Sequence, residues 1–155
     1  MTKRTGIQII LIEDNVHDAE MTMRTLQKHN LANPVIWLRD GEAAMEYLFG
    51  NGGAKTAAAS QTPGLILLDL KLPKIDGLEI LSRLKQDETT HMIPVIILTS
   101  SGEERDIVES YRLGVNSYVV KPVKFENFAE AVLQLGMYWL ILNQHPEQSR
   151  EDKNR

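Results

Sequence analysis

The sequence of 155 residues contains no cysteine. This absence excludes disulfide bonds, thiolate nucleophiles and cysteine-ligated zinc or iron–sulfur centres, and it fits the reducing conditions of the cytoplasm. Histidine offers no obvious metal site either, because the four histidines lack the spacing of metal ligands. They are His17, His29, His91 and His145. We expect each of them to be a surface or structural residue.

Long apolar segments are also lacking. Only six apolar-leaning residues, 7–12, follow residues 1–6, and these are too few for the core of a signal peptide. The apolar run at 131–142 is too short to span a bilayer. The formal net charge is −4 and the charges are dispersed, a pattern that does not favour nucleic-acid binding. We therefore expect a cytoplasmic protein that binds neither nucleic acid nor membrane.

The glycine-rich segment lacks the known phosphate-binding patterns. Residues 50–63 are rich in small side chains, but they contain neither Gly-x-Gly-x-x-Gly nor the P-loop pattern that ends in Gly-Lys-Ser or Gly-Lys-Thr. The segment also precedes a predicted strand, whereas a phosphate-binding loop follows one. We interpret it as a connector that is long for a compact domain.

Apolar strand patterns alternate with helical patterns along the rest of the chain. A hydrophobic content of 43% and a charged content of 25% are ordinary for a globular domain. Strands are predicted at residues 7–12, 35–38, 65–69, 93–98 and 117–120, and helices at 16–30, after Asp40-Gly41, and at 77–86, 103–113 and 125–142. This alternation predicts an α/β fold: a flavodoxin-like, doubly wound, five-stranded parallel sheet with strand order 2-1-3-4-5 and helices on both faces.

Chemically reactive side chains stand where four of the predicted strands end. Glu13-Asp14 follow the first strand, Asp69 ends the third, Thr99 follows the fourth and Lys121 follows the fifth. In the order 2-1-3-4-5, the carboxyl ends of these four strands meet at one edge of the sheet. Local structure offers simpler explanations, because Asp14 or Asn15 can cap the following helix and Asp69 can open a turn. Capping explains one acid of the Glu13-Asp14 pair well and the other less well.

Three carboxylates in one crevice would repel one another and raise the pKa of at least one of them. A divalent cation relieves this repulsion, and a site of oxygen ligands open to water suits Mg²⁺. Mg²⁺ and Lys121 would then hold a phosphoryl group while Asp69 attacks its phosphorus as a nucleophile, and Thr99 would hydrogen-bond a phosphoryl oxygen. A solvated lysine is the alternative for Lys121. Its place before Pro122, where a cis peptide is possible, favours a fixed direction.

These motifs, in this order, resemble the receiver domain of response regulators, the CheY-like phosphoacceptor half of two-component signalling. The matching segments are Glu13-Asp14, Leu68-Asp69-Leu70 with Pro73 and Gly77, Thr99-Ser100, and Lys121-Pro122. The resemblance implies that Asp69 accepts a phosphoryl group from a histidine kinase. It also implies a phosphorelay protein that assists its own phosphorylation and dephosphorylation without being a dedicated enzyme.

The resemblance further implies a role for each site residue. The implied ligands of Mg²⁺ are Glu13, Asp14, Asp69 and the backbone carbonyl of Lys71. Thr99 and Lys121 contact the phosphoryl group, and Tyr118 is the aromatic residue that changes position together with Thr99.

The acidic start, the 50–63 segment and the hydrophobic carboxyl end resemble more closely the stand-alone receivers paired with bacterial and cyanobacterial phytochrome histidine kinases. We predict an amino-terminal extension at residues 1–6, a receiver domain at 7–142, and a polar, disordered tail at 143–155. About a dozen polar residues follow the last predicted helix, too few for an output domain. We therefore expect output through contact with another, unidentified downstream protein.

The last predicted helix is apolar almost all round. One stripe is enough to pack on the sheet: Phe128, Val132, Leu135, Trp139 and Leu142. The apolar residues left over are Leu133, Met137, Leu140 and Ile141. Because exposed apolar patches usually mark interfaces, we predict a homodimer through these four residues. The alternative is that the tail folds back and covers them.

Three other functions remain open. A Mg²⁺-dependent phosphatase with an aspartyl nucleophile usually carries a second acid two residues after it, where this chain has Lys71. A flavodoxin-like flavin carrier needs a phosphate-binding loop after the first strand, where Glu13 and Asp14 would repel an anion. The third is a receiver-like docking module that is not phosphorylated, although no site residue is missing.

Overall fold

The computed structural model describes residues 8–29, 33–50, 63–100, 112 and 117–137. Within these ranges, five parallel strands form one sheet in the order β2-β1-β3-β4-β5. The strands are β1 (Gln8–Ile12), β2 (Val35–Leu38), β3 (Pro63–Asp69), β4 (Val95–Thr99) and β5 (Ser117–Val120). This order confirms the predicted flavodoxin-like sheet.

The inner strands are apolar on both faces, as parallel strands covered by helices must be. Every residue of β1 and of β4 is buried, and so are residues 65–69 of β3. The two edge strands are less buried than the inner strands. β2 is half-buried along its length, and β5 alternates between buried and exposed residues. The apolar runs of the sequence therefore mark the centre of the sheet.

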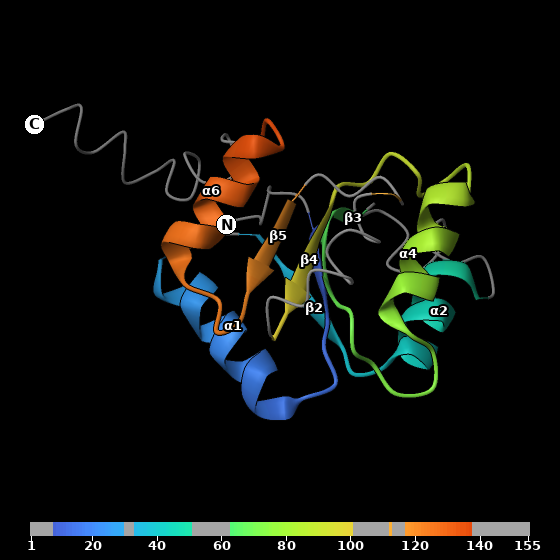
Figure 1. Ribbon diagram of the computed structural model, residues 1–155, viewed down its shortest axis with the longest axis horizontal. Helices are drawn as coiled ribbons and strands as arrows, with labels where there is room; N and C mark the ends of the chain where they lie inside the picture. The colour runs from blue at the N-terminus through green and yellow to red at the C-terminus, as the bar shows by residue number, and fades with distance from the viewer. Residues whose placement is uncertain (1–7, 30–32, 51–62, 101–111, 113–116, 138–155) are drawn as a thin grey trace, which may run out of the picture.

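Among the described residues, two pairs of helices cover the two faces of this sheet (Figure 1). Helices α1 (Val16–Lys28) and α6 (Phe125–Gln134) lie on one face, and α2 (Gly41–Phe49) and α4 (Gly77–Gln86) lie on the other. Successive residues of a strand point to opposite faces, so they enter different cores. The core under α1 and α6 contains Ile9, Leu11, Leu26, Phe128 and Val132, and the core under α2 and α4 contains Ile10, Ile12, Leu48, Ile80 and Leu84.

Helix α6 is much shorter than predicted. It ends at Gln134 instead of residue 142, and Gly136 then takes a φ of +76°. The Gly136 N–H donates to the Leu133 carbonyl at 2.9 Å and the Met137 N–H to the Val132 carbonyl at 3.0 Å, which is the usual way a left-handed glycine terminates a helix. The apolar pattern of residues 125–142 predicted one continuous helix, without a helix end at Gly136.

The early end of α6 changes the predicted dimer surface. Met137 is 7% exposed and packs in the core with Phe128 and Val132, so the prediction that Met137 is left over on the surface was wrong. Leu133 is 56% exposed, as predicted. Residues 139–142, including Leu140 and Ile141, lie outside the described residues.

The other bounds agree closely with the prediction. β2, α4 and β5 have the predicted bounds, whereas β1 begins one residue later and α1 ends at Lys28. β4 begins at Val95, after Pro94, because proline has no N–H to give to the ladder. The predicted extension, the 51–62 part of the connector, the 103–113 helix apart from Arg112, and the tail lie outside the described residues. No helix among the described residues is long and apolar enough to cross a membrane.

Candidate functional site

The structure brings the predicted strand-end residues together at the carboxyl edge of the sheet. Asp69 and Thr99 are the last residues of β3 and β4, and they are 4% and 3% exposed. Glu13 directly follows β1 and is fully buried. Lys121 directly follows β5, and its N–H donates to the Thr99 carbonyl at 2.7 Å. Four strands separated in sequence therefore contribute to one site.

The ammonium group of Lys121 lies at the centre of this site. Its Nζ is 2.9 Å from Oε1 of Glu13, 3.0 Å from Oδ2 of Asp18 and 3.4 Å from Oδ2 of Asp69. The Lys121 side chain is only 9% exposed, so the alternative of a solvated lysine was wrong. An ammonium group has three N–H donors, and these three carboxylates account for all of them. The Lys121–Pro122 peptide is cis.

Asp18 also belongs to the site, although its position in the sequence did not predict this. It stands in the first turn of α1, where an acidic residue is common because it interacts well with the helix dipole. Its position in the first turn therefore gave no reason to expect a contact with Lys121, which lies 103 residues further along the chain. The side chain of Asp18 is 34% exposed, so it forms the solvent-facing side of the Lys121 cluster.

Glu13, Asp14 and Asp69 form a group that fits a hard divalent cation. One carboxylate oxygen of each residue lies within 4.8 Å of those of the other two. Glu13 and Asp69 are buried, whereas Asp14 is exposed and leaves the group open to solvent. Oxygen ligands with an open side are what Mg²⁺ requires, since Mg²⁺ keeps several of its waters. The Lys71 N–H donates to Oδ1 of Asp69 at 3.2 Å, so the Lys71 backbone lies beside this group.

The buried charges shift two pKa values. The pKa of Glu13 is raised to about 7: burial raises it most, the hydrogen bond from Lys121 opposes the rise, and the nearby charge of Asp69 adds to it. Burial alone would lower the pKa of Lys121, but its hydrogen bonds to Glu13 and Asp18 and the charge of Asp69 raise that pKa above its ordinary value. Lys121 therefore stays charged, but its single positive charge is shared among three carboxylates.

The start of α4 packs directly on the end of β3 and so fixes the backbone beside Asp69. A Cβ atom on Gly77 would lie 2.4 Å from the Asp69 carbonyl oxygen and 2.6 Å from the Cα of Leu70. Only glycine allows this approach without a shift of the backbone. The Gly77 N–H donates to the Leu70 carbonyl at 3.0 Å. The close approach of α4 to the end of β3 therefore requires glycine at position 77.

The aromatic residue of the predicted switch lies on the edge strand. Tyr118 pairs with Ile97 of β4 and is 37% exposed, whereas Thr99 is buried at the end of β4. A coordinated movement of Tyr118 and Thr99 stays a prediction.

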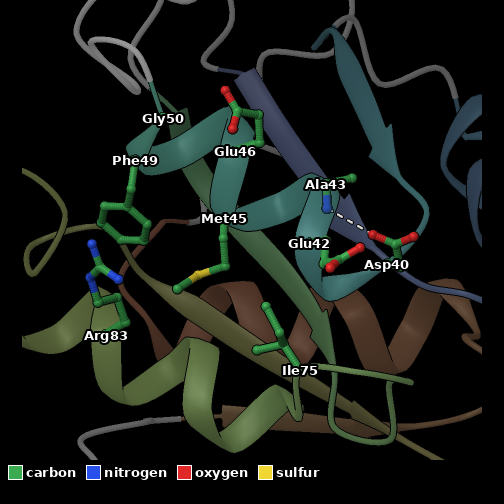
Figure 2. Close-up of a pocket in the computed structure, with 9 residues that line it drawn as sticks. All are labelled: Asp40, Glu42, Ala43, Met45, Glu46, Phe49, Gly50, Ile75 and Arg83. Atoms are coloured by element: carbon green, nitrogen blue, oxygen red, sulfur yellow. Dashed lines mark hydrogen bonds between the residues drawn. The ribbon is translucent and has the colours of Figure 1, made fainter.

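A hollow of about 620 Å³ lies between α2 and α4 and is separate from this site (Figure 2). Met45, Phe49 and Ile75 contribute its apolar side chains. The guanidinium carbon of Arg83 lies 4.4 Å from the centroid of the Phe49 ring, a cation–π contact. The hollow also has charged residues in its lining (Asp40, Glu42, Glu46 and Arg83), but none of the predicted site residues lines it.

The five-stranded parallel sheet therefore carries a buried lysine and clustered carboxylates at its carboxyl edge, the arrangement expected of a receiver domain. Residues 9–133 match the response regulator receiver domain family. The chain belongs to this family.

Two curated relatives match over nearly their full length. The probable methanogenesis regulatory protein FilR2 of Methanothrix harundinacea is 40% identical over 139 residues, which cover 89% of this chain and 86% of FilR2. The response regulator Rcp1 of Synechocystis sp. is 39% identical over 132 residues, which cover 85% of this chain and 88% of Rcp1.

Solved structures of similar proteins support the fold independently. The bacteriophytochrome response regulator AtBRR is 47% identical, with a TM-score of 0.76, over 86% of this chain and 95% of AtBRR. The phosphorylated cyanobacterial phytochrome response regulator RcpA is 38% identical, with a TM-score of 0.70, over 88% of this chain and 95% of RcpA. The Mn²⁺-bound form of Rcp1 is 37% identical, with a TM-score of 0.68, over 86% of this chain and 94% of that structure.

Proposed function

We propose that this chain is a phosphoacceptor of a two-component phosphorelay that takes a phosphoryl group on Asp69 with the help of Mg²⁺. One observation carries the proposal: Lys121, Glu13 and Asp14 surround the carboxylate of Asp69 at the open edge of the sheet. Similarity to a phosphorylated relative, RcpA, and to a Mn²⁺-bound relative, Rcp1, supports the same chemistry.

The residues suit an in-line transfer from a phosphohistidine. An oxygen of Asp69 attacks phosphorus, an O–P bond forms, and the P–N bond to the histidine of the kinase breaks, with the electron pair leaving on the imidazole. Bound Mg²⁺, held by Glu13, Asp14, Asp69 and the Lys71 carbonyl, would supply the positive charge that the phosphoryl oxygens need. Lys121 would exchange one of its three carboxylate contacts for a phosphoryl oxygen, and the Thr99 hydroxyl would donate to another.

The test of this function is the mass of the intact protein after incubation with acetyl phosphate. We expect one added phosphoryl group when Mg²⁺ is present and none when it is removed with a chelator. A chain that binds Mg²⁺ but gains no mass from acetyl phosphate or from a histidine kinase would be a docking module, which would contradict the proposal. Catalytic turnover of a phosphomonoester would support the phosphatase alternative instead.

The raised pKa of Glu13 predicts how Mg²⁺ binding depends on pH. Below its pKa of about 7 a proton competes with the metal for Glu13, so the affinity for Mg²⁺ should fall about tenfold for each further pH unit. Above that pH Glu13 is ionised and the affinity should level off. Calorimetric titration at several pH values measures this, and Glu13→Gln should bind Mg²⁺ more weakly but with a flatter pH profile. Native affinity that stays constant from about pH 6 to about pH 8 would contradict the account.

We infer that the phosphodonor is a histidine kinase, and that a phytochrome is the best candidate for its sensor. The support is the similarity to AtBRR and RcpA, both described as phytochrome response regulators, although FilR2 carries a different description. A partner of this kind has its phosphohistidine in the cytoplasm, so a cytoplasmic location belongs to the same proposal. Transfer from the purified phosphorylated kinase measures it.

We also infer a homodimer through the exposed side of α6. Leu133 is an apolar residue that is 56% exposed on this helix. A charge at an apolar contact must be desolvated without a partner, so Leu133→Glu should weaken the dimer by about tenfold or more. Light scattering after size-exclusion chromatography measures this. Asn127→Glu, at another exposed position of α6, is the matched control. A native chain that is monomeric at micromolar concentration, with and without phosphorylation, would contradict the dimer.

A further inference from the structure

Both backbone groups of Glu13 hold the β1–α1 loop, residues 13–15, to β2. The Glu13 N–H donates to the Leu38 carbonyl at 3.1 Å, and the Glu13 carbonyl accepts a hydrogen bond from the indole Nε1–H of Trp37 at 2.8 Å. At the far end of the loop, the Asn15 side chain accepts from the Asp18 N–H at 2.8 Å and caps α1. The loop is therefore held at both ends, and a single side chain of β2 supplies one of these contacts.

The Trp37 hydrogen bond acts on the peptide group that links the Cα atoms of Glu13 and Asp14, the two neighbouring residues of the proposed metal site. The Glu13 carbonyl belongs to the planar peptide that joins Glu13 to Asp14, so its direction also sets the direction of the Asp14 N–H. Glu13 lies on one side of this peptide and Asp14 on the other. A donor that fixes the carbonyl therefore restricts the backbone rotation that would move the two carboxylates relative to each other.

The indole of Trp37 is itself well held. Trp37 lies opposite Leu11 in the β1–β2 pairing and packs against the core that contains Ile9 and Leu26. The guanidinium carbon of Arg39 lies 5.3 Å from the centroid of the Trp37 ring. Because a ring held in this way has little freedom, its N–H is a donor of fixed direction.

We propose that Trp37 is a positioning residue for the Mg²⁺ site: its indole N–H orients the Glu13–Asp14 peptide so that both carboxylates face Asp69. The inference rests on the proposed function, because it assumes that Glu13, Asp14 and Asp69 hold the metal. It adds a residue of β2, the one strand that supplies none of the expected metal ligands or phosphoryl contacts. In metal sites, loss of a hydrogen bond that orients a ligand typically weakens binding 10- to 100-fold.

The variant Trp37→Phe tests the proposal because it keeps an aromatic ring and removes the N–H. We expect its dissociation constant for Mg²⁺, measured by calorimetry, to rise about tenfold. Once Mg²⁺ saturates the variant, phosphoryl gain from acetyl phosphate should return toward the native rate, since Trp37 acts through metal binding. A purely structural role would not produce this dependence on the Mg²⁺ concentration.

Tyr47→Phe is the matched control, because it also removes one donor from an aromatic side chain. The Tyr47 hydroxyl donates to Oε1 of Gln8 at 3.4 Å, and Gln8 begins β1 at the end opposite to Glu13. We expect Tyr47→Phe to bind Mg²⁺ like the native chain. Equal affinity of Trp37→Phe and native protein, or equal losses in Trp37→Phe and Tyr47→Phe, would overturn the role of Trp37 while leaving the Mg²⁺ site intact. A native chain without Mg²⁺ binding would overturn the proposed function itself, and this inference with it.

Discussion

Asp69→Asn is expected to lose phosphoryl incorporation completely. The amide oxygen of asparagine is not a nucleophile toward phosphorus, and the neighbouring carboxylates are held by Lys121 or needed for the metal. The variant should nevertheless fold, because an amide oxygen still accepts from Lys121 and removal of one negative charge relieves Glu13. We expect its free energy of unfolding without Mg²⁺ to equal the native value or to exceed it by about 1 kcal/mol.

The control for this variant is Asp76→Asn, which makes the same chemical change at an exposed residue. Asp76 precedes α4 and its side chain makes no capping hydrogen bond. It should gain one phosphoryl group from acetyl phosphate, like the native chain, when intact mass is measured. Undiminished phosphoryl gain in Asp69→Asn would move the acceptor to another residue and reject the assignment of Asp69.

Lys121→Met should have the second largest effect, on stability as well as on phosphorylation. It removes the only ammonium that the described structure places among Glu13, Asp18 and Asp69. Removing one partner of a buried ion pair typically costs about 3–5 kcal/mol, and we expect about 3 kcal/mol above pH 7. Below that pH Glu13 takes up a proton in the folded state, so the loss should be smaller.

Mg²⁺ should partly restore the stability of Lys121→Met, because the cation supplies charge where the ammonium is missing. Urea unfolding with and without Mg²⁺, at two pH values, measures both effects. Lys85→Met is the control, because Lys85 is half-buried and donates to backbone carbonyls, that of Ile93 at 3.1 Å and that of His91 at 3.4 Å. Burial lowers its pKa. Its loss of stability should be about 1 kcal/mol and independent of Mg²⁺. Equal behaviour of the two variants would contradict the charge argument for Lys121.

The sheet and the strand-end residues could be predicted because both depend on local patterns. Unbroken apolar runs mark strands buried on two faces, and a parallel sheet places all their carboxyl ends on one edge. Asp69, Thr99 and Lys121 could therefore be grouped although 52 residues separate Asp69 from Lys121. The predicted strand order was therefore enough to place these separate motifs in one site.

The contacts that prediction missed depend on how elements lie against one another. Asp18 reaches Lys121 only because the first turn of α1 and the residue after β5 meet at the same edge of the sheet, and Trp37 reaches Glu13 only because of the register between β1 and β2. No periodic pattern in the sequence predicts either of these contacts. The end of α6 is different, since Gly136 was visible in the sequence, but the apolar residues on both sides of it favoured a longer helix.

The measurement that tests the central claim most directly is the location of the phosphoryl group after reaction with acetyl phosphate and Mg²⁺. Borohydride reduces an aspartyl phosphate to homoserine and leaves ionised carboxylates unchanged, so peptide mass spectrometry then identifies the acceptor. We predict homoserine at Asp69 and at no other aspartate, and none when Mg²⁺ is withheld. Homoserine at Asp14 or Asp18, or an unmodified Asp69 in protein that has gained a phosphoryl group, would contradict the account.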